Sequence, residues 1–314
     1  MTATIIAIPT FRRPERLRQL LTSLARMKVT DDASILIADN DAAGRAGATL
    51  AEAVRAGGYA LPIEIIIVAE PGLCAVRNAI VETALAHPDM RHLVMIDDDE
   101  WPEADWLGEL LAVQRRTGAD VVGGPVYPHF ADRKPGWVRE TLVFRPESRP
   151  EGATGMLWAS NNLLVMRRAL DRLDRPWFDP RFGSSGGEDL DFLTRLHEAG
   201  CRFAWAPAAR VAEWVPADRA RLGWVMRRMW RIGITDTMVR RKQAAGAARG
   251  LALTGRAVAI LAARTVALPM ILWPGARRVD VAGQWVKSWG RLYALAGGSD
   301  ASYGQPAAPV QGET

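Results

Sequence analysis

Short apolar runs alternate with amphipathic segments over the first 125 residues. The apolar runs predict strands, and the segments between them carry apolar residues at helical spacing and predict helices. The predicted strands are 4–8, 34–38, 63–68, 92–96 and 120–123, and the predicted helices are 14–27, 46–56, 73–86 and 103–116. Strands and helices in this order indicate an α/β fold, in which helices flank a mostly parallel sheet.

The pattern changes after residue 124. Residues 124–186 are richer in proline, glycine and tryptophan; loops are predicted at 125–155, and a strand is expected at 162–166. A glycine-rich turn at 183–187 is expected to open an amphipathic helix that continues to Glu198. We assign residues 1–215 to one domain built on the sheet.

The remainder of the chain is basic and helical. Residues 216–291 carry 15 basic and three acidic residues, whereas the first 215 carry 25 basic and 30 acidic ones. The apolar stretch 251–273 is long enough to span a bilayer, but Arg256 and Arg264 lie inside it and favour a helix in the membrane interface. A second such helix is predicted at 281–296, so 216–297 forms a membrane-associated extension, followed by a disordered tail at 298–314.

An alternative for these two amphipathic helices is that they pack on the domain or on a second copy of the chain. A basic surface can meet an anionic bilayer, a polyphosphate or nucleic acid, but no nucleic-acid-binding pattern accompanies it. Two cysteines without metal spacing and an N-terminus without an export signal favour the cytoplasm. We therefore expect a peripheral protein on the inner face of the plasma membrane.

Four consecutive acids, Asp97, Asp98, Asp99 and Glu100, end the apolar run at 92–96. Such a concentration of carboxylates at a strand end favours a bound cation, because buried carboxylates without one are costly. Oxygen ligands without histidine or cysteine favour Mg²⁺ or Mn²⁺ together with a phosphate-bearing substrate. The alternative is a solvated turn or the cap of the following helix.

Glu188 and Asp189 form a second acidic cluster, at the start of the helix that ends at Glu198. Carboxylates are stabilised at a helix N-terminus, so capping explains them as well as catalysis does. The glycines before them allow a ligand to approach the backbone closely.

Several short motifs in a fixed order resemble those of family 2 glycosyltransferases, which have the GT-A fold. The motifs are Ile8-Pro9-Thr10-Phe11, Ile37-Ala38-Asp39-Asn40, Glu70-Pro71-Gly72, Ala75-Val76-Arg77-Asn78, Asp97-Asp98-Asp99-Glu100 and Gly187-Glu188-Asp189. Residues 211–216 and 224–233 resemble bacterial succinoglycan-type glucosyltransferases of exopolysaccharide synthesis. The resemblance implies an inverting hexosyltransferase with a nucleoside diphosphate sugar as donor, UDP-glucose being favoured.

The resemblance also implies roles for single residues. The donor would be bound by residues that follow the first strands, namely Pro9, Thr10, Arg12, Asp39, Arg77, Asp97 and Asp98. Asp99 would be the principal ligand of Mn²⁺ or Mg²⁺, with Asp97 beside it and Glu213 as a candidate third ligand. Asp189 would deprotonate the acceptor hydroxyl, and Glu188 would orient it.

Two further groups are predicted with alternatives. Arg228 and Arg231 share a helix face and can reach a pyrophosphate, or they can belong to a solvated basic helix. Asn161, Asn162 and Trp158 can contact the acceptor, although a turn and core packing explain them almost equally well.

The expected acceptor is a lipid-linked or other saccharide. Two other functions remain open at this stage: a sugar-nucleotide nucleotidyltransferase and a non-catalytic nucleotide-sugar-binding scaffold. The loop after the first strand, Pro9-Thr10-Phe11-Arg12, lacks the glycine-rich sequence expected of the former. The oligomeric state, the sugar and the linkage do not follow from the sequence.

Overall fold

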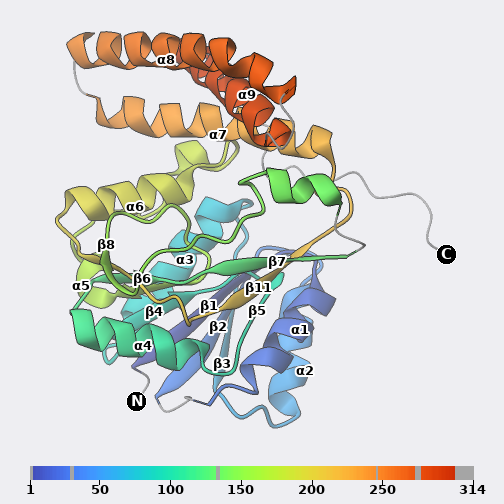
Figure 1. Ribbon diagram of the computed structural model, residues 1–314. Coiled ribbons are helices and arrows are strands. Elements are labelled where there is room, and N and C mark those ends of the chain that lie inside the picture. The colour runs from blue at the N-terminus through green and yellow to red at the C-terminus, as the bar shows by residue number, and fades with distance from the viewer. Residues whose placement is uncertain (1–2, 29–31, 132–134, 245–246, 273–276, 301–314) are drawn as a thin grey trace.

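The computed structural model describes residues 3–28, 32–131, 135–244, 247–272 and 277–300 (Figure 1). A central sheet of eight strands has the order β3-β2-β1-β4-β9-β6-β10-β8. Its strands are β1 (Thr4–Thr10), β2 (Ala33–Asp39), β3 (Ile63–Ile67), β4 (His92–Met95), β6 (Val121–Gly123), β8 (Gly152–Thr154), β9 (Leu163–Met166) and β10 (Phe203–Trp205). A second sheet consists of β5 (Glu100–Pro102), β11 (Val211–Val215) and β7 (Val126–Phe130), in that order.

Helices cover both faces of the central sheet. They are α1 (Pro14–Leu24), α2 (Ala46–Ala56), α3 (Leu73–Ala86), α4 (Trp106–Thr117), α5 (Arg167–Leu170) and α6 (Glu188–Glu198), with 3₁₀ turns at Gly136–Glu140 and Pro180–Phe182. Neighbours β1, β2, β3 and β4 are parallel, as are β6 and β10, whereas β9 and β8 run antiparallel to their neighbours. The predicted α/β fold with a mostly parallel sheet is confirmed.

The core divides into two layers because side chains alternate along each strand. Ile5 and Ala7 of β1 pack in the cluster that includes residues of α3 and α6. Ile6 and Ile8 point to the opposite face and pack with residues of α1, α2 and α4. Both faces of β1 are therefore buried, which fixes its carboxyl end in the middle of the sheet.

Most of the predicted elements are present with the expected bounds. The helices at 46–56 and 73–86 match α2 and α3, and the helix that continues to Glu198 is α6. The first helix ends at Leu24 instead of residue 27, and the fourth begins at Trp106 instead of residue 103. Pro14 opens α1, where its missing N–H costs no helical hydrogen bond.

Three helices follow the sheet: α7 (Leu222–Gln243), α8 (Ala247–Ala267), continued by a 3₁₀ turn at Leu268–Leu272, and α9 (Arg278–Leu295). Helix α9 packs closely on α7 and also contacts α8. Glycines permit the α7–α9 approach, since a Cβ at Gly233 would overlap the Lys287 carbonyl and one at Gly290 would overlap that of Trp230. We name α7 and α9 together the helical layer.

The second predicted interfacial helix corresponds to α9, and its place on a membrane stays a prediction. Its small residues Gly283, Ser288, Gly290 and Ala294 are buried, and the helix serves packing, which was the alternative. Among the described residues one helix, Arg249–Leu272, is long and apolar enough to cross a membrane. The predicted tail at 298–314 lies outside the described residues from residue 301 onward.

Candidate active site

The carboxyl end of β4 presents the first acidic cluster beside the end of β1. The Thr10 hydroxyl donates to Asp98 Oδ2 at 2.8 Å. Arg13 Nη1 donates to Asp98 Oδ1 at 3.3 Å and to Asp99 Oδ2 at 3.0 Å. Burial raises the pKa of Asp98 to about 6, while Arg13 opposes that shift. Asp98 is thus fixed by hydrogen bonds from Thr10 and Arg13.

Arg77 of α3 joins this cluster to the second one. Its side chain is only 4% exposed. Nη1 donates to Glu188 Oε1 at 3.1 Å and also to Asp189 Oδ1, and Nη2 lies 3.8 Å from Asp97 Oδ1. Two acidic stretches far apart in the sequence therefore converge on one guanidinium group. Three carboxylates around Arg77 carry more negative charge than it can balance.

Two of these acids have raised pKa values. Burial, together with Asp99 and Asp189, raises the pKa of Asp97 to about 7. Burial and the neighbouring Asp189 raise the pKa of Glu188 to about 6. Glu188 Oε2 is buried and accepts no hydrogen bond from the described residues. The cluster is therefore suited to receive a cation or a proton.

Asp189 is the member of the second cluster that reaches the surface. Its side chain is 24% exposed, and its Oδ1 accepts a hydrogen bond from Ser160 Oγ at 2.7 Å. Gly187 precedes it with φ +99°, and a Cβ there would come within 2.9 Å of Thr235 on α7. The glycine lets the first turn of α6 lie against α7 with Asp189 at its edge.

Glu100 and Glu213 extend the acidic region onto the second sheet. They are partners in the antiparallel pairing of β5 with β11. Glu100 is buried and accepts from Asn161 Nδ2 at 2.7 Å and from the Asp97 N–H at 2.9 Å. Burial and then Asp99 raise the pKa of Glu213, whereas Arg219 and Arg228 oppose that shift. Glu213 thus lies beside the first acidic cluster, while Asn161 is engaged with Glu100.

Two predicted contact residues are enclosed by the fold. Asp39 is fully buried and accepts from the N–H groups of Asp41 at 2.9 Å and Ala48 at 2.8 Å. Asn162 is also fully buried. It accepts from Trp106 Nε1 at 2.7 Å and donates to the Ala209 carbonyl at 2.8 Å. In this structure the polar atoms of Asp39 and Asn162 bind the backbone and Trp106, and their contacts with donor and acceptor stay predictions.

The other predicted residues lie around the same edge. Pro9 is half-buried in β1, and Arg12 has φ +55° with its Nε 3.1 Å from Asp41 Oδ1. Trp158 is 52% exposed. Arg228 of α7 acts electrostatically on both Glu188 and Glu213, which brings α7 to the acidic region. Arg231, one turn later on α7, is half-buried.

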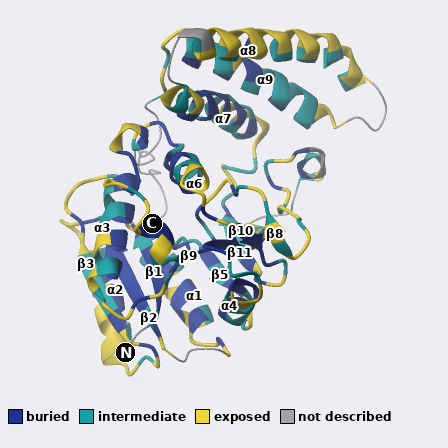
Figure 2. Ribbon diagram, turned by 90° about the vertical axis from the view of Figure 1, so that its left-hand side faces the viewer, coloured by how far each residue is buried: buried dark blue, intermediate teal, exposed yellow. Residues whose placement is uncertain are grey.

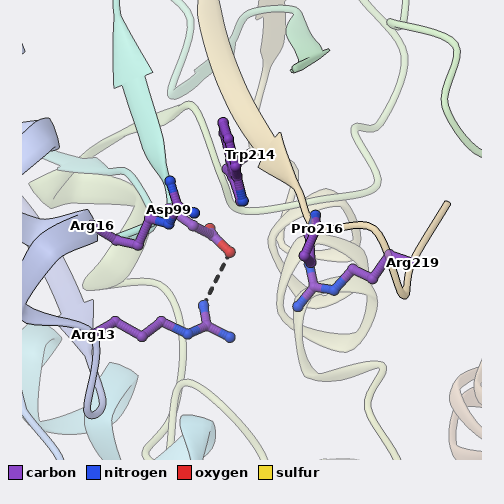
Figure 3. Close-up of a pocket in the computed structure, with 6 residues that line it drawn as sticks. All are labelled: Arg13, Arg16, Asp99, Trp214, Pro216 and Arg219. Atoms are coloured by element: carbon purple, nitrogen blue, oxygen red, sulfur yellow. Dashed lines mark hydrogen bonds and ion pairs between the residues drawn. The ribbon is translucent and has the colours of Figure 1, made fainter. Parts of the chain in front are cut away.

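A pocket of about 190 Å³ opens next to Asp99 (Figure 3). It is lined by Arg13, Arg16, Asp99, Trp214, Pro216 and Arg219. The Arg16 guanidinium lies 4.0 Å above the Trp214 ring, and Arg13 and Arg219 approach from opposite sides. Three guanidinium groups against one carboxylate make the pocket suitable for an anion. The sequence-based prediction included none of these arginines.

The side chains available as metal ligands restrict how a metal ion can bind. Among the described residues, no group of three or more His, Cys, Asp or Glu side chains is arranged to hold one. Mg²⁺ and Mn²⁺ fit such a site, since they accept one or two carboxylates and take their other ligands from phosphate and water. Asp99 and Asp97, the predicted ligands, would provide these two carboxylates.

Comparison with known proteins identifies the family. Residues 5–173 match the model of glycosyl transferase family 2. The chain is also 37% identical over 247 residues to the succinoglycan biosynthesis protein ExoM of Rhizobium meliloti (strain 1021), covering 77% of this chain and 76% of ExoM. The chain belongs to glycosyl transferase family 2. This family 2 protein is a glycosyltransferase, as the motifs around Asp97 and Asp189 predict.

Solved structures confirm the GT-A fold. S. aureus TarS 1-349 in complex with UDP has a TM-score of 0.52 at 12% identity, over 97% of this chain and 98% of that one. TarS 1-349 in complex with UDP-GlcNAc also gives 0.52, over 94% and 92%. Against the longer TarS chain the TM-score is 0.53, and this family 2 enzyme spans 42% of that chain's length. The similarity includes the helices after the sheet, since it covers nearly the whole chain.

Proposed function

We propose that this enzyme transfers a hexose from a nucleoside diphosphate sugar to a hydroxyl group, with inversion at the anomeric carbon. The observation that supports this best is the meeting of the two acidic clusters around Arg77. It brings Asp189, which is partly exposed, to the same edge of the sheet as Asp97 and Asp99. A base at one end of the site and anion-binding groups at the other suit a single displacement.

Asp189 is proposed to take the proton of the acceptor hydroxyl. One of its oxygens is engaged by Arg77 and Ser160, which fixes the orientation of the carboxylate. Arg77 acts as a positioning residue, because its guanidinium is shared by three carboxylates. This revises the expectation that Arg77 contacts the donor.

The diphosphate of the donor is proposed to lie in the pocket beside Asp99. Arg13, Arg16 and Arg219 offer it a fork of N–H groups each, which is the geometry that recognises phosphate oxygens. Arg228, close to Glu213, adds positive charge at the inner side. Trp214 keeps Arg16 in place by stacking.

Asp99 and Asp97, with Glu213 nearby, are proposed to hold Mn²⁺ or Mg²⁺. Such an ion neutralises charge on the diphosphate as the bond to the sugar breaks. Arg13 Nη1 lies 3.3 Å from Asp98 and 3.0 Å from Asp99 and offsets part of their negative charge.

UDP-hexose is the proposed donor, and a saccharide on a lipid carrier the proposed acceptor. ExoM is a succinoglycan biosynthesis protein, and the TarS structures contain UDP and UDP-GlcNAc. We therefore propose a role in a bacterial exopolysaccharide, on the cytoplasmic side of the membrane.

A donor panel tests the proposal. The purified enzyme is mixed with UDP, GDP and dTDP hexoses and a lipid extract, and released nucleoside diphosphate is measured with Mn²⁺, with Mg²⁺ and with a chelator. We expect release from a UDP-hexose only with a metal ion present. Release that persists undiminished in chelator rejects the metal, and product with retained configuration rejects the single displacement.

A further inference from the structure

We propose that α8 docks on an anionic lipid bilayer and lies in the plane of the membrane, with the helical layer between it and the sheet. Only 6% of its most apolar window is buried. Figure 2 shows α8 exposed along the side that faces away from α9. This inference is independent of the proposed reaction, because α8 contributes no residue to the candidate active site.

The exposed side of α8 is an apolar strip. Large apolar side chains on it are far more open than is usual, with Leu251 at 75% and Val266 at 81% exposed. Val258 and Met270 are also exposed. Residues 251, 255, 258, 262 and 266 follow the spacing of one helix face, and all are apolar or glycine. We define the apolar strip as Leu251, Val258, Ala262, Val266 and Met270.

The charged residues around the apolar strip indicate what kind of partner binds it. Residues 247–272 contain no acidic residue. Arg249 and Arg256 are exposed and lie seven residues apart, so both fall on one flank of the apolar strip. Arg277 and Arg278, at the start of α9, are exposed as well. Arginines beside an apolar strip suit lipid phosphates, whereas a second copy of the chain would bring like charges together.

Contacts with α9 favour the in-plane orientation over a membrane-spanning one. Arg264 Nη1 donates to the Gln284 carbonyl at 2.5 Å and to Ser288 Oγ at 2.7 Å. Trp285 Nε1 donates to Thr265 Oγ1 at 3.1 Å. A spanning helix would have to break these bonds and place Arg264 in the hydrocarbon region. Lying in the interface preserves them and buries only the apolar strip.

Vesicle sedimentation with the full chain tests the proposal. Vesicles of phosphatidylglycerol mixed with phosphatidylcholine should bind the wild-type protein, and phosphatidylcholine alone should bind it less. Val266→Glu should weaken binding about tenfold or more, since it removes apolar burial and adds a repelled charge. Arg249→Gln and Arg256→Gln should each weaken binding to the mixed vesicles by about fivefold. Ile67→Glu, at an exposed apolar position on β3, is the matched control and should bind normally.

Other results would overturn the proposal. The proposal fails if the wild-type protein does not bind the mixed vesicles, or if the Val266→Glu variant binds them as well as the wild type does. It also fails if alkaline carbonate does not extract the bound protein, because that would indicate a spanning helix. Self-association that depends on Val266 would show that a second copy of the chain, and not a bilayer, covers the apolar strip. Donor hydrolysis and circular dichroism of Val266→Glu should equal those of the wild type, so a failed reaction and a failed docking are told apart.

Discussion

Two buried charge clusters of this protein have opposite balances. At the edge of the sheet, Arg77 serves three carboxylates, those of Asp97, Glu188 and Asp189. In the helical layer, Asp236 serves three cations, with Arg291 at 2.9 Å, Arg240 at 3.0 Å and Lys287 at 4.0 Å.

The two clusters respond differently to this imbalance. Asp97 and Glu188 at the sheet edge have raised pKa values, chiefly because they are buried. Asp236, in contrast, has a lowered pKa, since its surrounding cations outweigh its burial. A carboxylate held firmly in its charged form stabilises packing, whereas carboxylates with a pKa of about 6 or 7 exchange a proton near neutral pH and gain from a nearby cation. We therefore propose a catalytic role for the first cluster and a packing role for the second.

The largest effect is expected from Asp189→Asn. Loss of a general base lowers turnover about 100- to 10,000-fold. Stability should change little, because one negative charge leaves a cluster that has too many. Turnover is measured by nucleoside diphosphate release and stability by urea unfolding. Glu198→Gln, at the exposed end of α6, is the control, and an Asn variant with more than about a tenth of wild-type turnover contradicts the assignment.

Asp236→Asn should show the reverse behaviour. Removing the charge leaves buried cations unpaired and lowers the free energy of unfolding by about 3 kcal/mol. Turnover per folded molecule should stay near that of the wild type. Asp218→Asn, exposed before α7, serves as control in the same urea titration. Unchanged stability with a large loss of turnover would break the distinction between the two clusters.

Glu188→Gln should alter the dependence of stability on pH. The pKa of Glu188 is raised from 4.5 to about 6 in the folded protein, so the folded state holds this proton more tightly than the unfolded state. Its contribution to stability is therefore present below about pH 4.5 and is lost as the pH rises through about 6. The difference amounts to about 2 kcal/mol.

This difference is measured by urea unfolding at pH 4 and pH 8 without divalent ions. The Gln variant should lose less stability than the wild type between these pH values. Equal losses in the two proteins would mean that Glu188 does not contribute to the excess negative charge of the cluster.

Arg219→Gln is expected to have the smallest effect. A lost charge-assisted hydrogen bond to the diphosphate raises the KM for the donor about tenfold and leaves kcat nearly unchanged. Initial rates against donor concentration measure both constants. Arg221→Gln changes an exposed arginine that does not line the pocket, and it should behave as wild type. A fall in kcat alone would place Arg219 outside donor binding.

Much of the fold follows from local pattern. Helices α2 and α3 have the predicted bounds because each is flanked by strands with clear apolar runs. Strands β5, β8 and β10 have three residues each, too few for a periodic signal, and were not predicted. The prediction of loops at 125–155 was wrong for β7 and β8, which lie within that stretch. The direction of β9 depends on its neighbours β4 and β6, which no pattern within 162–166 can reveal.

The candidate active site was predicted at its carboxylates but not at their partners. Acidic runs are visible in the sequence, whereas the burial of Asp39 and Asn162 depends on α2 and Trp106 packing over them. The role of Arg77 depends on α3 and α6 meeting across one face of the sheet. For α9 a signal was present, since Gly283 and Gly290 lie seven residues apart and indicate close helix packing.

The helical layer also sets the distance between α7 and a bilayer that is bound by α8. Because α9 separates α7 from α8, and packed helix axes lie about 8–10 Å apart, α7 stands up to about 20 Å from a bilayer on which α8 rests. Arg228 brings the acidic edge to α7, so with a lipid-linked acceptor and α8 on the bilayer, as proposed, the hydroxyl would have to lie about that far above its lipid. The enzyme would then not act on sugars next to the lipid carrier and would elongate only saccharide chains that are already several units long.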